Sequence, residues 1–343
     1  MNGQKWKALA SAMGIMILIL DTRTGISAAR EGIELCIKAL IPSLFPFFVL
    51  SAILTGNLGS MQPKWMKKME KWFHFPEGSG HLLIVGVLSG YPVGAGNVCG
   101  CYRKKQLSKE DAERMIALCN NAGPSFLFGV LSGQFSHICF IWMLWGTQIL
   151  SLFLTARLTN SPLDRFSAEH SGPAISPIQA MNQALRSMAS VCGWVIIARV
   201  LLSFFNQYLF PWLPGLIQII MTGLVELTNG CLLLNKIPQE GLRFTIASIL
   251  LAFGGICVHM QTGSVCRELS MKKYLRIKGI QSLVCGFLSI GIQFLFRPSN
   301  RIIHPGFLLI IAAPLIVMTK RRKKAVAFRR HLMYNQEKRT ERG

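Results

Sequence analysis

The sequence predicts an all-α polytopic membrane protein, with about eight transmembrane helices plus two re-entrant hairpins in an inverted repeat. The 343-residue chain is 51% hydrophobic and only 15% charged, which is less charge than a soluble domain of this size carries. Its apolar residues form about eight blocks close to the roughly 17–25 residues that cross a bilayer. Its basic residues lie in short runs between these blocks.

The net charge of +22 has two interpretations. In a soluble protein it would suggest nucleic-acid binding. Here the Lys and Arg residues gather at 64–71, 103–105, 272–278 and in the tail 320–343, without the interleaved aromatic residues of a nucleic-acid surface. Cytoplasmic loops of membrane proteins collect such charge. We therefore expect the lipid bilayer and no nucleic acid as a partner, and both termini in the cytoplasm.

The N-terminal part predicts a first helix over about 8–20 that runs outward. Asp21-Thr22-Arg23 is a poor cleavage site, so this helix is interpreted as retained rather than as a signal peptide. An amphipathic stretch follows, then a second helix over about 39–58 and a basic loop over 62–74.

The apolar segment 81–101 lies between two basic runs. A full crossing would leave one run outside, so we predict a hairpin that enters and leaves on the same side. Its centre, residues 89–97, contains Pro92 and three glycines, which disfavour a uniform helix. Ser108 is expected to cap the next helix, over about 109–134, which is interrupted at 120–125.

A helix over about 136–156 and a polar linker then lead to the second half, which repeats the plan. We expect a helix over about 178–206, followed by an apolar segment, 212–234, that is broken around 226–230 and enters from outside. The segment 242–262 is broken at Gly254-Gly255. A basic loop over 267–278 and helices over 279–296 and 303–319 complete the pattern.

These elements define the predicted organisation of the chain. The parts are a first helix with the amphipathic segment (1–38), a first repeat (39–157), a polar linker (158–177), a second inverted repeat (178–296), a last transmembrane helix (297–319) and a basic cytoplasmic tail (320–343).

Broken apolar segments at matching places in two halves are the best sequence indication of a transporter's midplane site. Unwound backbone at membrane depth needs protein or a water-filled cavity around it, and N–H groups at half-helix starts bind anions. The alternative is that these glycines and prolines only kink and pack helices. The predicted substrate-binding residues are Ser89, Gly90, Tyr91, Pro92, Gly94, Asn97, Asn120, Asn121, Gly123, Pro124, Glu226, Thr228, Gly230, Gly255 and Gln261.

Two ionisable residues inside apolar runs are further candidates. Glu226 could bind a proton or Na⁺ or contact the substrate, or it could be a structural partner of Arg199 or Arg243. Arg199 could pair with an anionic substrate or extend toward the interface. His259 is more simply explained as a hydrogen-bonded side chain.

Other chemistry is not indicated. The chain lacks G-x-S-x-G, H-E-x-x-H and P-loop motifs, so we expect no enzyme, no cofactor and no metal site. Its ten cysteines are interpreted as small apolar residues without redox or metal chemistry; Cys99-x-Cys101 has no second pair at zinc-finger spacing.

Five motifs carry a family resemblance. They are Leu40-Ile41-Pro42-Ser43-Leu44-Phe45-Pro46-Phe47, Ser89-Gly90-Tyr91-Pro92-Val93-Gly94, the stretch 107–126 with Asn120-Asn121-Ala122-Gly123-Pro124, Gly223-Leu224-Val225-Glu226-Leu227-Thr228-Asn229-Gly230, and Phe253-Gly254-Gly255 through Gln261. Over residues 35–265 the chain resembles the YlbJ-type sporulation integral membrane proteins, of the nucleoside-recognition (gate) domain group.

The resemblance implies export of dipicolinate from the mother cell across the outer forespore membrane of an endospore-forming bacterium. Half-helix N-termini and Asn side chains would hold its carboxylates, and Tyr91 could stack on its ring. Independently of the resemblance, H⁺ or Na⁺ is expected as a coupling ion, because Glu226 could bind either. Two alternatives stay open: a nucleoside-type carrier, and a non-transporting scaffold or sensor in spore assembly. By analogy with the family, a homo-oligomer is expected.

Overall fold

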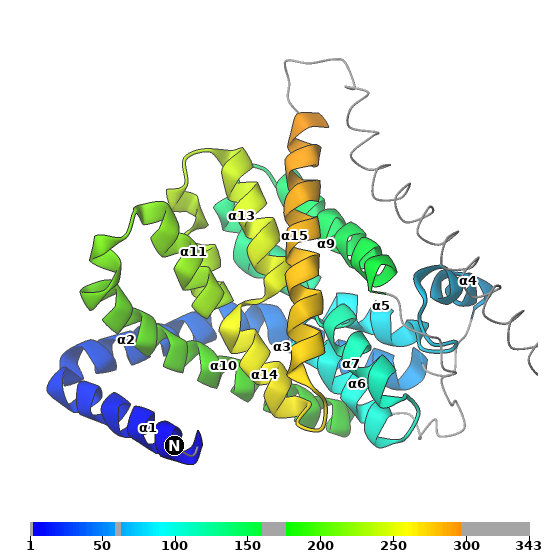
Figure 1. Cartoon of the computed structure of the whole chain (residues 1–343), viewed down its shortest axis with the longest axis horizontal. Helices are drawn as coiled ribbons and strands as arrows, with labels where there is room; N and C mark the ends of the chain where they lie inside the picture. The colour runs from blue at the N-terminus through cyan, green and yellow to red at the C-terminus, as the bar shows by residue number, and fades with distance from the viewer. Residues whose placement is uncertain (1–2, 59–62, 160–175, 296–343) are drawn as a thin grey trace, which may run out of the picture. The chain divides into compact units, whose positions relative to one another are not determined.

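The computed structural model describes residues 3–58, 63–159 and 176–295, which form helices joined by short breaks (Figure 1). Five of these helices are long and apolar enough to cross a membrane: Thr22–Leu54, Cys139–Leu158, Pro177–Tyr208, Glu240–Val265 and Met271–Phe294. The helical membrane class is thus confirmed, while eight crossings stay a prediction. The predicted helix 303–319, the tail and most of the linker lie outside the described residues. The account below concerns the compact unit that ends at Ser289.

The N-terminal segment is more continuous than the sequence predicts. After α1 (Gly3–Leu20), α2 (Thr22–Leu35) passes through a π-helical turn (Cys36–Leu40) into α3 (Ile41–Leu58). The Asp21 carboxylate accepts a hydrogen bond from the Thr24 amide, 3.1 Å away, and caps α2. The predicted amphipathic stretch and second helix are therefore one long helix, because no strong helix breaker separates them.

The long helix α10 (Pro177–Tyr208) packs along α2 and α3. Gly25, Ala28 and Gly32 form the buried face of α2, and a Cβ built on Gly32 would lie 3.0 Å from the Ile196 backbone of α10. Small residues on one helical face let two helices approach closely. The predicted helix 178–206 is confirmed, and Ser176 with Gln179 forms a capping box at its start.

The first half continues with short helices. They are α4 (Lys64–Phe73), α5 (Gly80–Ser89), α6 (Val93–Arg103), α7 (Lys109–Leu118) and α8 (Pro124–Phe126). Helix α8 continues through a π turn (Leu127–Leu131) and a 3-10 turn (Ser132–Gln134). The longer helix α9 (Cys139–Leu158) follows. The predicted cap is confirmed, since the Ser108 hydroxyl accepts from the Asp111 amide at 3.2 Å.

The prediction that residues 62–74 form a loop is wrong, because most of this segment is the helix α4. Met66 and Glu70 are buried on one face of α4. The Glu70 carboxylate accepts hydrogen bonds from the Gly78 and Gly80 amides at 3.0 and 2.6 Å. This carboxylate therefore fixes α4 against the start of α5.

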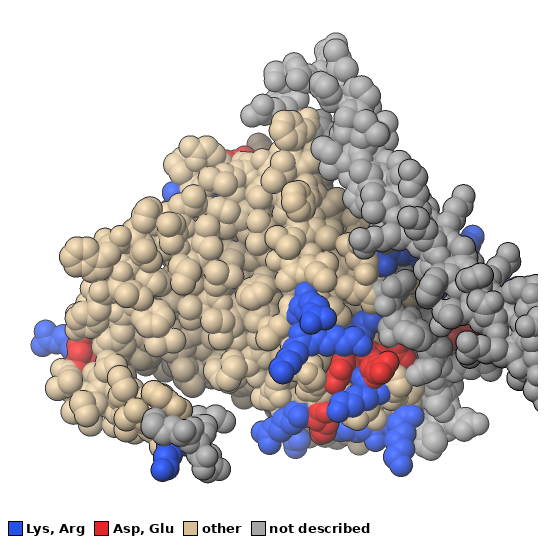
Figure 2. Space-filling view, viewed as in Figure 1, with Lys and Arg blue, Asp and Glu red and all other residues tan. Residues whose placement is uncertain are grey.

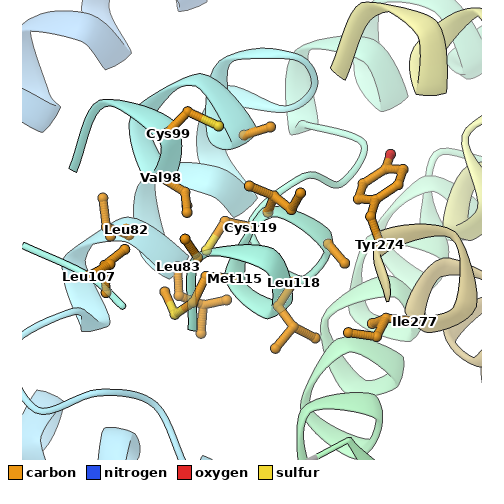
Figure 3. Close-up of a cluster of buried hydrophobic side chains, with 14 of the residues drawn as sticks. Leu82, Leu83, Val98, Cys99, Leu107, Met115, Leu118, Cys119, Tyr274 and Ile277 are labelled. Atoms are coloured by element: carbon orange, nitrogen blue, oxygen red, sulfur yellow. The ribbon is translucent and has the colours of Figure 1, made fainter. Parts of the chain in front are cut away.

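A hydrophobic cluster joins α5, α6 and α7 to the start of α15 (Met271–Leu295) (Figure 3). Leu83, Val98 and Met115 are buried in it. Ile277 and Tyr274 of α15 complete the cluster from the other end of the chain. The first hairpin is thus packed against an element of the second half.

From α10 on, the second half shows a long helix, a helix pair, a broken helix and a last helix, in the order that α3 and α5–α9 show in the first half, but without a counterpart of α4. A 3-10 turn (Phe210–Trp212) precedes α11 (Gly215–Val225) and α12 (Leu227–Leu232); another (Leu234–Lys236) precedes α13 (Glu240–Phe253), α14 (Gly255–Val265) and α15. The predicted breaks around 226 and 254–255 are confirmed. The predicted loop 267–278 is shorter than expected, because α15 begins at Met271 and includes most of its basic residues.

The described residues on the face shown in Figure 2 are largely uncharged. Exposed apolar residues include Trp142, Leu150, Ile197, Leu283 and Phe287, as expected for helices in contact with lipid. The charged residues in the view of Figure 2 gather mainly near α6, α7 and the start of α15. The basic runs 103–105 and 272–276 therefore share one end of the described structure.

One interpretation of the cysteines is corrected. Cys99 of α6 and Cys266, directly after α14, form a disulfide with a Cα–Cα distance of 5.8 Å. Nearby, Arg103 forms an ion pair with Glu268 at 3.1 Å. The hydrogen bonds that Arg103 donates in this pair hold the pKa of the Glu268 carboxyl below its usual value. Spacing along the chain did not indicate this pairing, because the two cysteines are 167 residues apart.

Candidate functional site

The first break is the turn of a helical hairpin. A Cβ built on Gly94 of α6 would lie 3.0 Å from the Cα of Gly86 on α5 and 1.8 Å from the carbonyl oxygen of Cys119. The two arms therefore fold back on each other around Gly90 and leave no room for a side chain at Gly94. Helices of 10 and 11 residues are about 15 Å long, half the hydrocarbon thickness.

The second break repeats this arrangement. A Cβ built on Gly230 of α12 would lie 2.1 Å from the Cα of Gly223 on α11. These glycines lie on either side of Glu226, the residue between the two helices. In both halves, paired glycines allow the arms of a broken segment to make backbone contact.

Each hairpin also touches the break of the following helix. Gly90 has φ +76°, and a Cβ on it would lie 2.8 Å from the Gly123 nitrogen. In the second half, a Cβ on Gly255, with φ +74°, would lie 2.9 Å from the Gly223 oxygen and 3.4 Å from the Leu227 nitrogen. Positive φ values suit glycine. The unwound segments therefore meet in pairs.

A cavity of about 30 Å³ lies where the breaks converge. Seven predicted site residues line it: Ser89, Gly90, Tyr91, Gly123, Glu226, Thr228 and Gln261. The rest of its wall is formed by Leu40, Leu44, Ser125, Phe126, Val191, Val195, Leu227 and Val258. This volume holds only one or two water molecules, so the structure represents a closed arrangement of the site.

Three hydroxyl groups in the cavity wall have no hydrogen-bond partner. The oxygens of Ser89, Tyr91 and Ser125 are buried and unpaired. The Tyr91 ring lies 6.4 Å from the Phe126 ring. Buried hydroxyls are normally hydrogen-bonded, and each can donate one bond and accept others. The cavity wall therefore contains three residues with unused hydrogen-bonding capacity, which a polar ligand could satisfy.

The Glu226 carboxylate, by contrast, is fully engaged. One oxygen accepts from the Thr228 amide at 3.0 Å, and the other accepts from the backbone and side-chain nitrogens of Asn229 at 2.7 and 2.8 Å. Glu226 therefore caps α12 with a negative charge, where the helix dipole favours an anion. The half-helix N-terminus predicted to bind a substrate anion is occupied by the chain's own carboxylate.

Arg199 is linked to Glu226 through Asn229. Its guanidinium donates to the Asn229 amide oxygen at 3.0 Å and to the Glu31 carboxylate at 2.5 Å. Arg243, the other partner weighed from the sequence, donates instead to the carbonyls of Ile237 and Gln134. The buried carboxylate thus has a structural connection to Arg199 through one amide, and Arg243 plays no part in it.

Asn120 and Asn121 lie beside the cavity and bind other side chains. The Asn120 amide donates to the Thr262 hydroxyl at 2.8 Å and to the Tyr274 hydroxyl at 3.2 Å. The Asn121 oxygen accepts from Gln281 at 2.8 Å and from Lys278 at 3.3 Å. These asparagines connect the first broken helix to α14 and α15.

The other predicted site residues shape the backbone. Pro92 ends the first break, with a cis Tyr91–Pro92 peptide bond, and Pro124 begins α8. Gly94, Gly230 and Gly255 provide the close contacts described above. Asn97 lies on α6, half-buried and outside the cavity wall. His259 is hydrogen-bonded to the Tyr274 hydroxyl at 3.2 Å, as its simpler interpretation expects.

Sequence reasoning missed two contributors. Ser125 directly follows the Gly123-Pro124 break and belongs to the cavity wall, and its buried hydroxyl has no hydrogen-bond partner. Lys278 was assigned to a basic loop, yet it is only 1% exposed and contacts Asn120. A buried face at helical spacing, with Tyr274, Gln281 and Cys285, could have revealed it. No cluster of three metal-ligating side chains occurs within the described ranges.

Comparison with known proteins supports the resemblance stated above. No family model and no solved structure matches the chain. It is 23% identical to the sporulation integral membrane protein YlbJ of Bacillus subtilis (strain 168), over 87% of this chain and 85% of that protein. The YlbJ-type resemblance is confirmed. The similarity to YlbJ spans both halves of the chain.

Proposed function

We propose that the chain transports a small organic anion, dipicolinate, across the outer forespore membrane during sporulation. One observation carries the proposal: three buried hydroxyls without partners surround a cavity where unwound segments meet. The relative YlbJ is a sporulation integral membrane protein. Dipicolinate comes from the family resemblance, and its carboxylate and ring-nitrogen acceptors suit hydroxyl donors.

In this proposal the two hairpins are re-entrant gates of an inverted repeat, with both termini in the cytoplasm. Their half-bilayer arms, the shared order of elements and the basic runs at one end support it. The closed cavity must widen to admit a ring with two carboxylates. Glycine contacts at Gly90–Gly123 lack interlocking side chains, which makes this junction a suitable place for the hairpin to separate.

A second cavity supplies a route for an anion. It has a volume of about 530 Å³ and is lined by Arg199, Lys236 and the buried Thr222, whose hydroxyl has no partner. This size lies within the range of small-molecule pockets, and two cations in its wall attract anions. Arg199 in the wall of the larger cavity also donates to Asn229, which donates to Glu226 in the wall of the central cavity, so hydrogen bonds join the two walls.

Glu226 gives the proposal a coupling step. A carboxylate in the wall of the central cavity repels an anionic substrate at short range. A proton or a cation that enters with the substrate offsets this repulsion. Transport coupled to a proton gradient is therefore expected, and Glu226→Gln is expected to remove its dependence on pH.

The proposal is tested with purified protein in liposomes. Uptake of labelled dipicolinate is measured for the wild type and for Tyr91→Phe and Ser125→Ala, which each delete one unpaired cavity hydroxyl. Ser248→Ala is the matched control, because its hydroxyl is equally buried and unpaired but lies outside the cavity. Each cavity variant is expected to lower uptake about fivefold to tenfold, for one lost hydrogen bond of about 1–1.5 kcal/mol. Absence of uptake under anion and proton gradients would reject transport and favour the scaffold.

A nucleoside-type carrier is the second candidate. Glu226 is the one charged side chain among the described residues of the cavity wall, its oxygens are bonded within the protein, and the remaining polar groups include the unpaired hydroxyls of Ser89, Tyr91 and Ser125. This chemistry suits a neutral ligand with several hydroxyls, such as a ribose. Inhibition of dipicolinate uptake by uridine, or uptake of labelled uridine itself, would favour this carrier.

A further inference from the structure

Lys278 is a buried cation at the first break. It lies in α15, is only 1% exposed, and its Nζ donates to the Asn120 carbonyl at 3.1 Å, to the Asn121 side-chain oxygen at 3.3 Å and to the Gln281 oxygen at 2.9 Å. An ammonium group has three N–H donors. All three therefore have a partner, and two of these partners belong to the unwound segment after α7.

The partners of Lys278 are neutral oxygens. None of the ion pairs in the described part of the chain includes it. A buried charge without a counter-ion is costly, so the surrounding dipoles must stabilise it. The C-terminal end of α7, which carries the negative end of the helix dipole, supplies one. Asn121 is fixed in turn by its donation to the Leu118 carbonyl at 2.7 Å.

This arrangement has the chemistry of a cation site. In transporters with broken helices, unwound carbonyls and half-helix C-termini coordinate the coupling Na⁺. Here one unwound backbone carbonyl, that of Asn120, and the side-chain amide oxygens of Asn121 and Gln281 surround the lysine ammonium. We propose that Lys278 is a tethered cation that occupies the place of a coupling sodium ion at the first break, so that the protein works without Na⁺.

The comparison of Lys278 with a coupling ion rests on the proposed transport function. The first test of the inference measures stability and does not need transport. Lys278→Ala removes the three methylene groups beyond Cβ and the ammonium, a piece the size of n-propylammonium. Thermal unfolding of the purified full-length protein is expected to start lower by roughly 5 °C, because buried acceptors lose their donors. Added n-propylammonium should restore most of this loss, while 1-propanol, of similar shape without the charge, should not.

Two further variants keep the test decisive. Lys272→Ala removes an exposed cation from the same helix and is expected to leave the unfolding temperature unchanged. Lys278→Met fills the space without a charge, and should remain destabilised and insensitive to n-propylammonium. If Lys278→Met is as stable as the wild type, or if 1-propanol rescues Lys278→Ala equally well, a cation is not required there and the inference fails.

The second test uses the transport assay. Wild-type uptake and stability should be the same in sodium, potassium and choline salts. A wild type that requires Na⁺, or is stabilised by it over choline, overturns the inference even if dipicolinate is transported. Conversely, rescue of Lys278→Ala by n-propylammonium in a protein that transports nothing rejects the proposed function and leaves the tethered cation in place.

Discussion

The two halves of the molecule stabilise their broken segments with opposite charges. In the second half, the Glu226 carboxylate accepts from amides at the start of α12. In the first half, the Lys278 ammonium donates to the Asn120 carbonyl after α7. An unwound segment at membrane depth leaves backbone donors or acceptors without partners. The comparison shows that a side chain of the required sign lies at each of the two segments, and that the second half of the chain supplies both side chains.

The two charges also differ in origin. Glu226 lies two and three residues from the amides that it caps, whereas Lys278 reaches the first break from 158 residues away. The second break is therefore locally stabilised, while the first depends on α15 being folded against it. Both charges engage protein groups, which leaves the hydroxyls of Ser89, Tyr91 and Ser125 for a ligand.

The largest expected effect tests whether both hairpins need the same close contact. Gly94→Ala would place a Cβ 1.8 Å from a backbone atom, and Gly230→Ala would place one 2.1 Å from a backbone atom. Overpacking usually costs about 1–3 kcal/mol, and more where the backbone must move. We expect little folded protein in detergent, measured by size-exclusion chromatography.

Gly146→Ala is the control for these variants, because a Cβ there meets nothing within 4 Å. Normal yields for either hairpin variant would contradict the close packing of its arms. A loss confined to one hairpin would show that the two halves are not equivalent.

The next effect concerns the local cap. Glu226→Ala leaves the amides of Thr228 and Asn229 and the side chain of Asn229 without their acceptor, at a cost of about 1–3 kcal/mol for each buried donor left unpaired. Glu226→Gln keeps one oxygen and should lose less. Thermal unfolding measures both against Glu268→Gln, an exposed carboxylate. Equal unfolding temperatures for the wild type and Glu226→Ala would show that the cap is dispensable.

A smaller effect is expected at Asn229, which connects the cap to Arg199. Asn229→Ala removes one side-chain bond to each neighbour and keeps the backbone cap, so a loss of about 1 kcal/mol is expected. The exposed Asn235→Ala serves as control in the same unfolding assay. A loss as large as that of Glu226→Ala would mean that the arginine connection, rather than the local cap, holds the second break.

The smallest effect on stability is expected at the cavity hydroxyls. Ser89→Ala, Tyr91→Phe and Ser125→Ala break no hydrogen bond within the protein, so their unfolding free energies should stay within about 0.5 kcal/mol of the wild type. Their uptake rates should nevertheless fall. Destabilisation as large as that of Asn229→Ala would indicate that these hydroxyls have structural partners, and would weaken the binding site.

The breaks were predictable because their cause is local. Gly90, Pro92 and Gly254-Gly255 disfavour a regular helix whatever surrounds them, and Ser108 caps its helix through a residue three positions away. Helix α4 and the first turns of α15 were predicted as loops, because basic residues gather in the cytoplasmic loops of membrane proteins and both segments are rich in lysine. That rule describes location relative to the membrane and does not exclude helical structure.

The sequence by itself determined where the helices break and that Glu226 lies inside an apolar run. Only the tertiary structure decided which side chains meet at those breaks. It brought Lys278 to Asn120, paired Cys99 with Cys266 and left three hydroxyls unpaired around one cavity. Local backbone preferences act over a few residues, whereas these contacts join segments far apart in the chain and form only when the helices pack.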